Sequence, residues 1–167
     1  MTEERWPILL TGATGFVGRH VLEELLRRGH SVRALARHPG ALTPRPNLQV
    51  LGGSVLEPAT LGPAVHGCRS VIRLVGIINE KQASFAAVHT EGTRHLLAAA
   101  RAAGTVRRWV QMSALGARPD AVARYHQSKW AAEELVRHSG LPYVILRPSL
   151  IHGPGGEFTA LLRDWSQ

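Results

Sequence analysis

A chain of 167 residues, 44% of them hydrophobic and 19% charged, has the size and composition of one globular domain that buries its own core. No apolar run approaches the roughly 20 residues of a membrane-spanning helix, and the short acidic N-terminus is unlike a secretory signal. Cys68 is the only cysteine, which excludes an internal disulfide and suits a reducing compartment. These observations predict a cytoplasmic protein without membrane insertion.

The formal net charge of +8 raises the question of a nucleic-acid partner. The basic residues are nearly all arginines, scattered singly or in pairs, and Lys81 and Lys129 are the only lysines. Because no basic cluster follows one helix, we expect no nucleic-acid partner and ascribe the charge to a general attraction for anionic dinucleotides. The nine histidines are dispersed without the spacing of metal ligands, so we expect no metal site.

Short apolar runs alternate with longer stretches of helical periodicity. In chain order, the predicted strands cover residues 8–10, 31–36, 48–51, 71–75, 109–112 and 143–146. In chain order, the predicted helices cover residues 16–28, 60–66, 85–103 and 125–138, and the glycines that follow them are Gly29, Gly67, Gly104 and Gly140. This alternation predicts an α/β fold, a doubly wound parallel sheet of order 3-2-1-4-5-6 with right-handed crossovers and helices on both faces.

A glycine-rich turn joins the first strand to the first helix with the spacing Gly-x-x-Gly-x-x-Gly. Gly12 permits a tight turn, Gly15 lets the backbone approach a pyrophosphate, and Gly18 lets the helix pack closely. The start of the helix offers free N–H groups and a partial positive charge to phosphates. The residues that we expect to contact a dinucleotide here are Gly12, Thr14, Gly15, Phe16, Val17 and Gly18.

The end of the second strand indicates which dinucleotide binds. NAD-binding proteins hold the ribose hydroxyls with an acidic residue about 20 positions after the turn, but no acidic residue occurs between Gly29 and Asn47. Arg37 stands there instead, and a guanidinium pairs well with a 2′-phosphate, which a carboxylate would repel. The sequence therefore favours NADP(H), with NAD(H) as the second choice; the alternative is that Arg37 is a solvated surface residue.

A candidate catalytic group consists of Ser113, Tyr125 and Lys129. Tyr125 and Lys129 are four residues apart in a predicted helix and share one face of it, while Ser113 follows the fifth strand. In a hydride-transfer site, Tyr125 would exchange a proton with the reacting oxygen, and the ammonium of Lys129 would lower the tyrosine pKa. Lys129 would also hold the nicotinamide ribose, and Ser113 would orient the carbonyl group of the substrate.

Several segments together resemble the atypical and extended short-chain dehydrogenase/reductases. They are residues 11–18, 74–78, 88–93, 112–117 and 146–149, and among such proteins they are most similar to relatives of the NAD(P)-binding accessory subunit of respiratory NADH dehydrogenase. The resemblance implies an NAD(P)-binding fold whose nicotinamide end lies near Val75, Gly76, Ser113, Tyr125, Lys129 and Pro148. It also allows a homodimer through the helices of Phe85 and Tyr125.

The chain departs from the family pattern in three respects. His89 stands where extended reductases usually carry the asparagine of a proton relay. Ser54 replaces an aspartate that usually holds the adenine amine, so adenine contact would fall to the backbone of Ser54 and Val55. Such proteins also run well beyond this length, so we expect residues 1–167 to be a single NAD(P)-binding domain whose C-terminal substrate-binding part is largely missing.

Two functions remain open at this stage. The first is an NADP(H)-dependent oxidoreductase or epimerase that acts on a small carbonyl, hydroxyl or nucleotide-sugar-like substrate. The second is a dinucleotide-binding structural or sensory subunit without turnover, which the substitutions at positions 54 and 89 favour.

Overall fold

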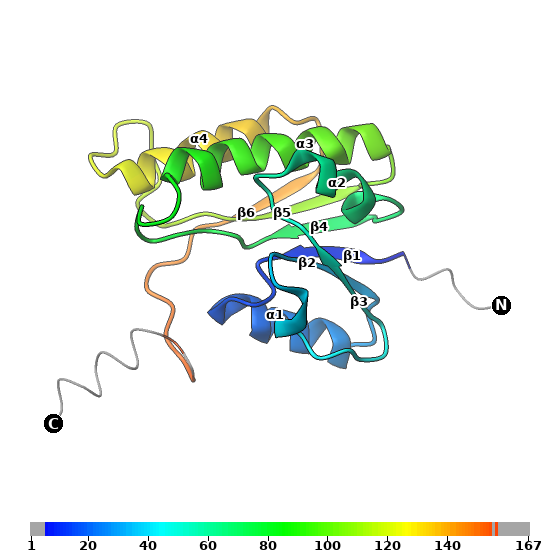
Figure 1. Ribbon diagram of the computed structural model, residues 1–167. Coiled ribbons are helices and arrows are strands. Elements are labelled where there is room, and N and C mark those ends of the chain that lie inside the picture. The colour runs from blue at the N-terminus through cyan, green and yellow to red at the C-terminus, as the bar shows by residue number, and fades with distance from the viewer. Residues whose placement is uncertain (1–5, 155, 157–167) are drawn as a thin grey trace, which may run out of the picture.

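The computed structural model describes residues 6–154 and 156. Its centre is a six-stranded sheet in the order β3-β2-β1-β4-β5-β6, in which every neighbouring pair of strands is parallel (Figure 1). The strands are β1 (Ile8–Thr11), β2 (Val32–Ala36), β3 (Leu48–Gly52), β4 (Ser70–Arg73), β5 (Arg108–Met112) and β6 (Tyr143–Leu146). The predicted α/β class and strand order are therefore confirmed.

Helices cover both faces of this sheet. The helix α1 (Phe16–Arg27) lies on one face, and α2 (Pro58–Val65), α3 (Gly92–Ala103) and α4 (Arg124–Arg137) lie on the other (Figure 1). A short 3-10 turn, Pro39–Ala41, interrupts the proline-containing loop after β2. Along the part of the chain that the structure describes, no helix is both long and apolar enough to cross a membrane.

The sheet separates two apolar layers because successive side chains of a strand point to opposite faces. Leu9 belongs to the layer under α2, α3 and α4, together with Leu96 and the fully buried Trp109. Its neighbour Leu10 belongs to the layer under α1, where it packs with Leu22. This alternation fixes the register of β1 and therefore the position at which its carboxyl end meets the glycine-rich turn.

The only cysteine lies in the first of these layers. Cys68 is fully buried between α2 and β4, and its thiol lies 3.5 Å from the carbonyl oxygen of Ala64 and 3.5 Å from Nη1 of Arg33. Burial raises the pKa of the thiol, and the charge of Arg33 opposes this effect. Cys68 is a packing residue, and its thiol is not poised as a nucleophile.

The predicted helix over residues 85–103 is divided. Its first part is a π-helix, η2 (Ala86–Glu91), and its second part is α3. The strand before it, β4, also ends earlier than predicted, at Arg73, where its partner β1 ends at Thr11. These two departures are linked, because the guanidinium of Arg73 donates hydrogen bonds to the η2 carbonyl oxygens of Val88 and His89. A side chain that inserts between helical carbonyls changes the local hydrogen-bond register.

Candidate functional site

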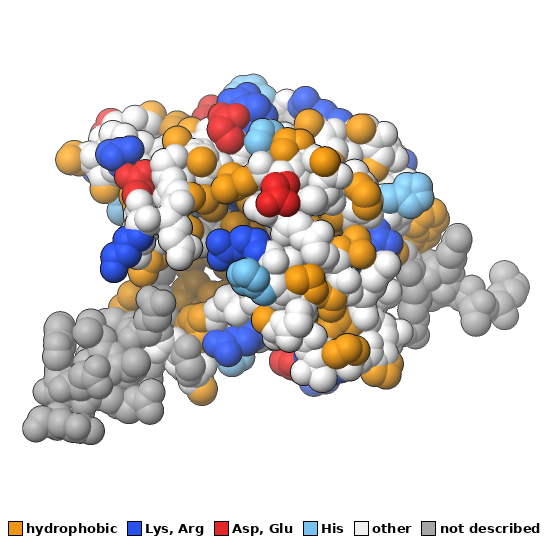
Figure 2. All heavy atoms as spheres, viewed as in Figure 1, with side chains coloured by type: hydrophobic (Ala, Val, Ile, Leu, Met, Phe, Trp, Pro, Cys, Tyr) orange, Lys and Arg blue, Asp and Glu red, His pale blue; other side chains and the backbone are white. Residues whose placement is uncertain are grey.

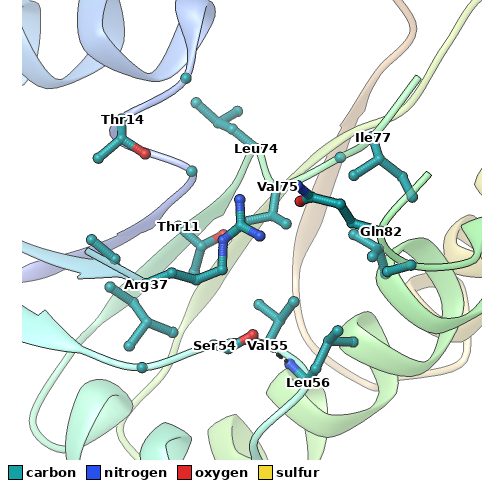
Figure 3. A pocket seen from close by; sticks show the side chains of 18 of the residues that line it. Thr11, Thr14, Arg37, Ser54, Val55, Leu56, Leu74, Val75, Ile77 and Gln82 are labelled. Atoms are coloured by element: carbon teal, nitrogen blue, oxygen red, sulfur yellow. Dashed lines mark hydrogen bonds between the residues drawn. The ribbon is translucent and has the colours of Figure 1, made fainter. Parts of the chain in front are cut away.

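A cleft of about 480 Å³ opens at the carboxyl ends of β1 to β4 (Figure 3). Such a crevice, where the strand order reverses, is the usual ligand position in open parallel sheets. The cleft is lined by Thr11, Gly12, Thr14, Gly15, Leu35, Ala36, Arg37, Gly53, Ser54, Val55, Leu56, Leu74, Val75, Gly76, Ile77, Asn79, Lys81, Gln82, Ala83 and Val88.

The glycine-rich turn forms one wall of the cleft. Gly12 has φ +80°, and a Cβ there would lie 2.9 Å from the backbone nitrogen of Val75. A Cβ on Gly18 would lie 1.8 Å from the carbonyl oxygen of Gly12. The turn is thus closed by backbone contacts that only glycine permits at these two positions. The predicted packing role of Gly18 is confirmed, but it is buried beneath the turn and does not line the cleft.

The N-terminus of α1 faces this cleft, next to Gly15, whose own N–H donates a hydrogen bond of 3.0 Å to the Gly12 carbonyl oxygen. Gly15 is the N-cap residue and contributes no side-chain hydrogen bond, and the first turn of α1 carries no acidic residue. Gly15 itself lines the cleft, whereas the predicted contacts Phe16 and Val17 are not among its lining residues. Free N–H groups and the positive end of the helix dipole suit a phosphate at this position, so the residues present fit a pyrophosphate.

Arg37 stands at the end of β2 and extends its guanidinium into the cleft (Figure 3). Its side chain is exposed, and none of the acidic groups that the structure describes forms an ion pair with it. Ser54 and Val55 lie opposite, after the end of β3. The structure therefore brings together the predicted residues of the adenosine end, with a free cation among them.

Elsewhere the basic side chains are dispersed. On the face drawn in Figure 2, lysine and arginine side chains are separated by polar, apolar and acidic ones, with no continuous basic patch. Among the described residues, no group of three histidine, cysteine, aspartate or glutamate side chains is placed to hold a metal ion.

Lys129 lies directly behind the cleft wall at Gly76. Its side chain is only 4% exposed, and its Nζ donates a hydrogen bond of 3.3 Å to the carbonyl oxygen of Met112. A Cβ on Gly76 would lie 3.1 Å from this Nζ, so glycine at position 76 leaves the ammonium accessible from the cleft. The ring centroid of Tyr125 is 5.6 Å from the same Nζ. Tyr125 and Lys129 thus share one face of α4, as predicted, at the edge of the cleft and not in its lining.

The electrostatics of this pair differ from the prediction. Burial raises the pKa of Tyr125, so the expected lowering by Lys129 is wrong for the structure described here. Lys129 is itself perturbed, because burial, together with the positive charge of Arg73, lowers its pKa to about 8. Burial disfavours the ammonium form of Lys129, so less positive charge is available beside Tyr125 to stabilise a tyrosinate.

Ser113 makes a hydrogen bond within the fold. Its side chain is buried, and its hydroxyl donates a hydrogen bond of 2.5 Å to Oε1 of Glu133. The Glu133 carboxylate is fully buried and also accepts hydrogen bonds from Arg137 and Arg147. The hydroxyl proton of Ser113 is therefore engaged within the fold in this structure, and its role in orienting a substrate carbonyl stays a prediction.

Pro148 has a structural contact at this edge of the sheet. Its carbonyl oxygen accepts a hydrogen bond of 2.9 Å from the backbone nitrogen of Leu115, and it does not line the cleft. This bond continues the pairing of the segments that follow β5 and β6.

His89 is fixed by contacts on every side. Its Nε2 accepts a hydrogen bond of 3.0 Å from the Ile77 backbone N–H, and its Nδ1 lies 2.8 Å from Oγ of Ser128. Because the Ser128 hydroxyl donates to the Tyr125 carbonyl oxygen, Nδ1 must carry the ring proton.

The imidazole of His89 is also packed and desolvated, and Phe85 stacks on it with ring centroids 5.6 Å apart. Burial, with the charges of Lys129 and Arg73, lowers the His89 pKa to about 3. Both ring nitrogens are therefore occupied, and His89 holds the loop after β4 in place of relaying protons.

The loop after β4 contributes residues that sequence reasoning missed. Asn79, Lys81 and Gln82 line the cleft, and Figure 3 shows the Gln82 side chain beside Val75. The general rule that loops after parallel strands line the crevice could have indicated this segment. Which of its side chains turn inward depends on its path.

Comparisons with known proteins agree with this geometry. A family model described as NAD(P)H-binding matches residues 12–163. The chain therefore belongs to this NAD(P)H-binding family of Rossmann-type proteins.

Ceramide reductase of Caulobacter vibrioides is 35% identical over 159 residues, which cover 92% of this chain and 49% of that protein. A 3 beta-hydroxysteroid dehydrogenase/Delta 5-->4-isomerase of Mycobacterium tuberculosis is 37% identical over 123 residues, covering 68% of this chain and 33% of the relative. The chain thus spans about half the length of the first relative and a third of the second.

Among solved structures, a short-chain dehydrogenase/reductase superfamily protein of Agrobacterium tumefaciens with bound NAD superimposes with a TM-score of 0.71. It is 32% identical, and the match covers 84% of this chain and 48% of that one. The relatives therefore include reductases and dehydrogenases of the short-chain dehydrogenase/reductase type, and they do not show the narrower resemblance to respiratory accessory subunits.

Proposed function

We propose that this chain is the cofactor-binding part of an NADP(H)-dependent oxidoreductase or epimerase of the short-chain dehydrogenase/reductase type, acting on a small carbonyl, hydroxyl or nucleotide-sugar-like substrate. The observation that carries the cofactor preference is Arg37, an exposed cation that extends into the cleft without an acidic partner among the described residues. A 2′-phosphate is the part of NADP that NAD lacks, and a guanidinium can bind it through two hydrogen bonds.

Different residues of the chain would contact different parts of the cofactor along the cleft. The N–H groups of the first turn of α1 would bind the pyrophosphate where Gly15 opens the backbone to it, and Ser54 and Val55 would border the adenine. Lys129, reached past Gly76, would hold the nicotinamide ribose. A bound nicotinamide supplies or accepts a hydride. Tyr125 would then be the proton donor to the substrate oxygen, because its phenol stays protonated at neutral pH when burial raises its pKa.

The names of the relatives support a reductase. One relative is named as a reductase of ceramide and another as a dehydrogenase of 3 beta-hydroxysteroids. The Agrobacterium structure contains NAD, not NADP, so the choice between the two cofactors needs a direct test. Arg37 is the residue on which that choice depends.

Calorimetric titration with NADPH and, separately, NADH tests the proposal. We expect Arg37→Ala to weaken NADPH binding by about 10- to 100-fold, the range for a charge-assisted hydrogen bond, and to leave NADH binding unchanged. Arg108→Ala is the matched control, since Arg108 is an exposed arginine at the first residue of β5, the edge of the sheet away from the cleft. Equal affinities of the unmodified chain for NADPH and NADH would refute the preference.

A second candidate is a dinucleotide-binding subunit without turnover, of the kind found beside respiratory NADH dehydrogenase. The observations in its favour are that the Ser113 hydroxyl donates a hydrogen bond to Glu133 and that both ring nitrogens of His89 are engaged in hydrogen bonds. Tyr125→Phe separates the two functions. For an enzyme, this change should lower NADPH-dependent carbonyl reduction about 100-fold or more while cofactor binding persists. A biological role that survives the change undiminished would favour the binding subunit.

A further inference from the structure

Arg73 is a fully buried arginine at the last position of β4, immediately below the cleft wall. Its Nη1 donates a hydrogen bond of 3.0 Å to the carbonyl oxygen of Val75, and its Nη2 donates one of 2.5 Å to that of Val88. Its Nε has no hydrogen-bond acceptor. Carbonyl dipoles thus replace the carboxylate that a buried guanidinium usually requires.

Lys129 is the second buried cation of this region. Its ammonium lies where a Cβ on Gly76 would touch it, and the Arg73 guanidinium binds the carbonyl of the preceding residue, Val75. The two positive charges therefore approach the same short segment of backbone from α4 and from β4. Like charges that share a low-dielectric region disfavour each other's charged form.

The groups that face Lys129 offer no compensating negative charge. His89 of η2 presents a neutral imidazole, Tyr125 of α4 its ring, and β5 the carbonyl oxygen of Met112. The acidic side chains of η2, α4 and the loop after β4 pair with arginines elsewhere: Glu91 with Arg94, Glu133 with Arg137 and Arg147, Glu134 with Arg137, and Glu80 with Arg124. No ion pair joins any of them to Lys129 within the described part of the chain.

We propose that Arg73 is a positioning residue whose buried charge, held at the Val75 carbonyl beside Gly76, weakens the ammonium form of the neighbouring Lys129 and so controls the positive charge at the inner end of the cleft. The electrostatic directions support this arrangement. Burial and then the charge of Arg73 lower the pKa of Lys129 to about 8, while burial lowers that of Arg73 to about 10. Arg73 therefore remains charged in the range in which Lys129 loses its proton.

One consequence rests on the proposed function. If Lys129 holds the cofactor ribose as an ammonium, NADPH binds the protonated form better, and its affinity falls as the pH rises through the titration of Lys129. The charge of Arg73 sets the pH at which this fall occurs. Without that charge, the protein would keep its affinity to higher pH.

The chain contains only two lysines, which makes a direct test simple. In protein prepared with isotope-labelled lysine and without cofactor, NMR titration gives one side-chain signal for Lys129 and one for the exposed Lys81 as an internal reference. The Lys129→Arg variant assigns the two signals. We expect the Lys129 midpoint near 8. We expect the Arg73→Met substitution, which removes the charge but leaves a long unbranched side chain, to raise this midpoint by at least about half a pH unit.

Arg73→Lys separates charge from shape. It keeps a positive charge at position 73 but cannot reproduce the two-pronged contact with the Val75 and Val88 carbonyls. If charge sets the protonation of Lys129, the lysine variant keeps a low midpoint and only the methionine variant raises it. If Arg73 acts by holding the backbone alone, both variants raise the midpoint equally, and the proposal is overturned.

A midpoint at the ordinary lysine value of about 10.4 in the unmodified protein overturns the proposal without any substitution. The measurement is made without a dinucleotide, so it does not depend on whether NADPH binds. A low midpoint that Arg73→Met raises and Arg73→Lys does not, together with no NADPH binding, would support the role of Arg73 and refute the proposed function.

Discussion

The buried imidazole of His89 should make the fold sensitive to mild acid. In the folded chain its pKa is about 3, whereas an unfolded histidine titrates near 6.5. Between these values the unfolded state binds a proton that the folded state does not. The free energy of unfolding must therefore fall as the pH falls from about 6.5 towards 3, and the contribution is fully present above 6.5.

The size of the effect follows from the same two values. Each pH unit within the window corresponds to about 1.4 kcal/mol, so lowering the pH from 7.5 to 5 should cost about 2 kcal/mol through His89 alone. His89 is fully buried, so no screening by solvent reduces this figure substantially. A loss of this size is a large fraction of the stability of a typical domain.

Urea unfolding at a series of pH values measures this loss. The chain has nine histidines, so the useful quantity is the difference in slope between the unmodified protein and His89→Asn. The asparagine carbonyl offers an acceptor for the Ile77 N–H, and its side chain has no titratable nitrogen. Parallel pH profiles for the two proteins would refute the reasoning, whatever their absolute stabilities.

Two further substitutions test the packing around the site. Gly18→Ala should lower the free energy of unfolding by about 2 kcal/mol or more and abolish NADPH binding, because the added Cβ would lie 1.8 Å from the Gly12 carbonyl oxygen. Gly40→Ala, in the short 3-10 turn, where nothing beyond its two chain neighbours lies within 4 Å of the new Cβ, should instead stabilise by about 0.4–1 kcal/mol, and equal melting temperatures for both variants would contradict this contrast. Glu133→Gln should cost about 3–5 kcal/mol in urea unfolding, because it leaves the Arg147 guanidinium without its buried carboxylate, and a loss below about 1 kcal/mol would show that the ion pairs contribute little.

The parts of the fold that depend on local pattern could be predicted from sequence. The strands are short apolar runs, and their alternation with amphipathic helices leaves few parallel topologies open. The glycine-rich turn is also local, since Gly12 and Gly18 meet within a single turn of chain. Arg37 follows directly from the end of β2, so its place at the cleft follows from the strand itself.

The parts that depend on distant side chains could not be predicted in this way. The π-helix forms where Arg73 reaches carbonyl groups 15 and 16 residues later in the chain, and periodicity contains no information about such a contact. Ser113 donates a hydrogen bond to Glu133, 20 residues away on a helix, and the sequence pattern gave no sign of this pairing. In both cases a buried polar group had to find a partner, and the fold as a whole decided which one.

Because the single cysteine is buried, the rate at which it is alkylated reports how often the structure around it opens. Cys68 is fully buried where α2 meets β4, and its raised thiol pKa slows alkylation further. A thiol reagent can therefore modify the native chain only when this corner separates transiently. The rate of labelling under native conditions would measure how often the apolar layer around Cys68, between α2 and β4, opens, without any probe added to the sequence. A dinucleotide that binds across the ends of β1 to β4 should slow that labelling in proportion to its occupancy.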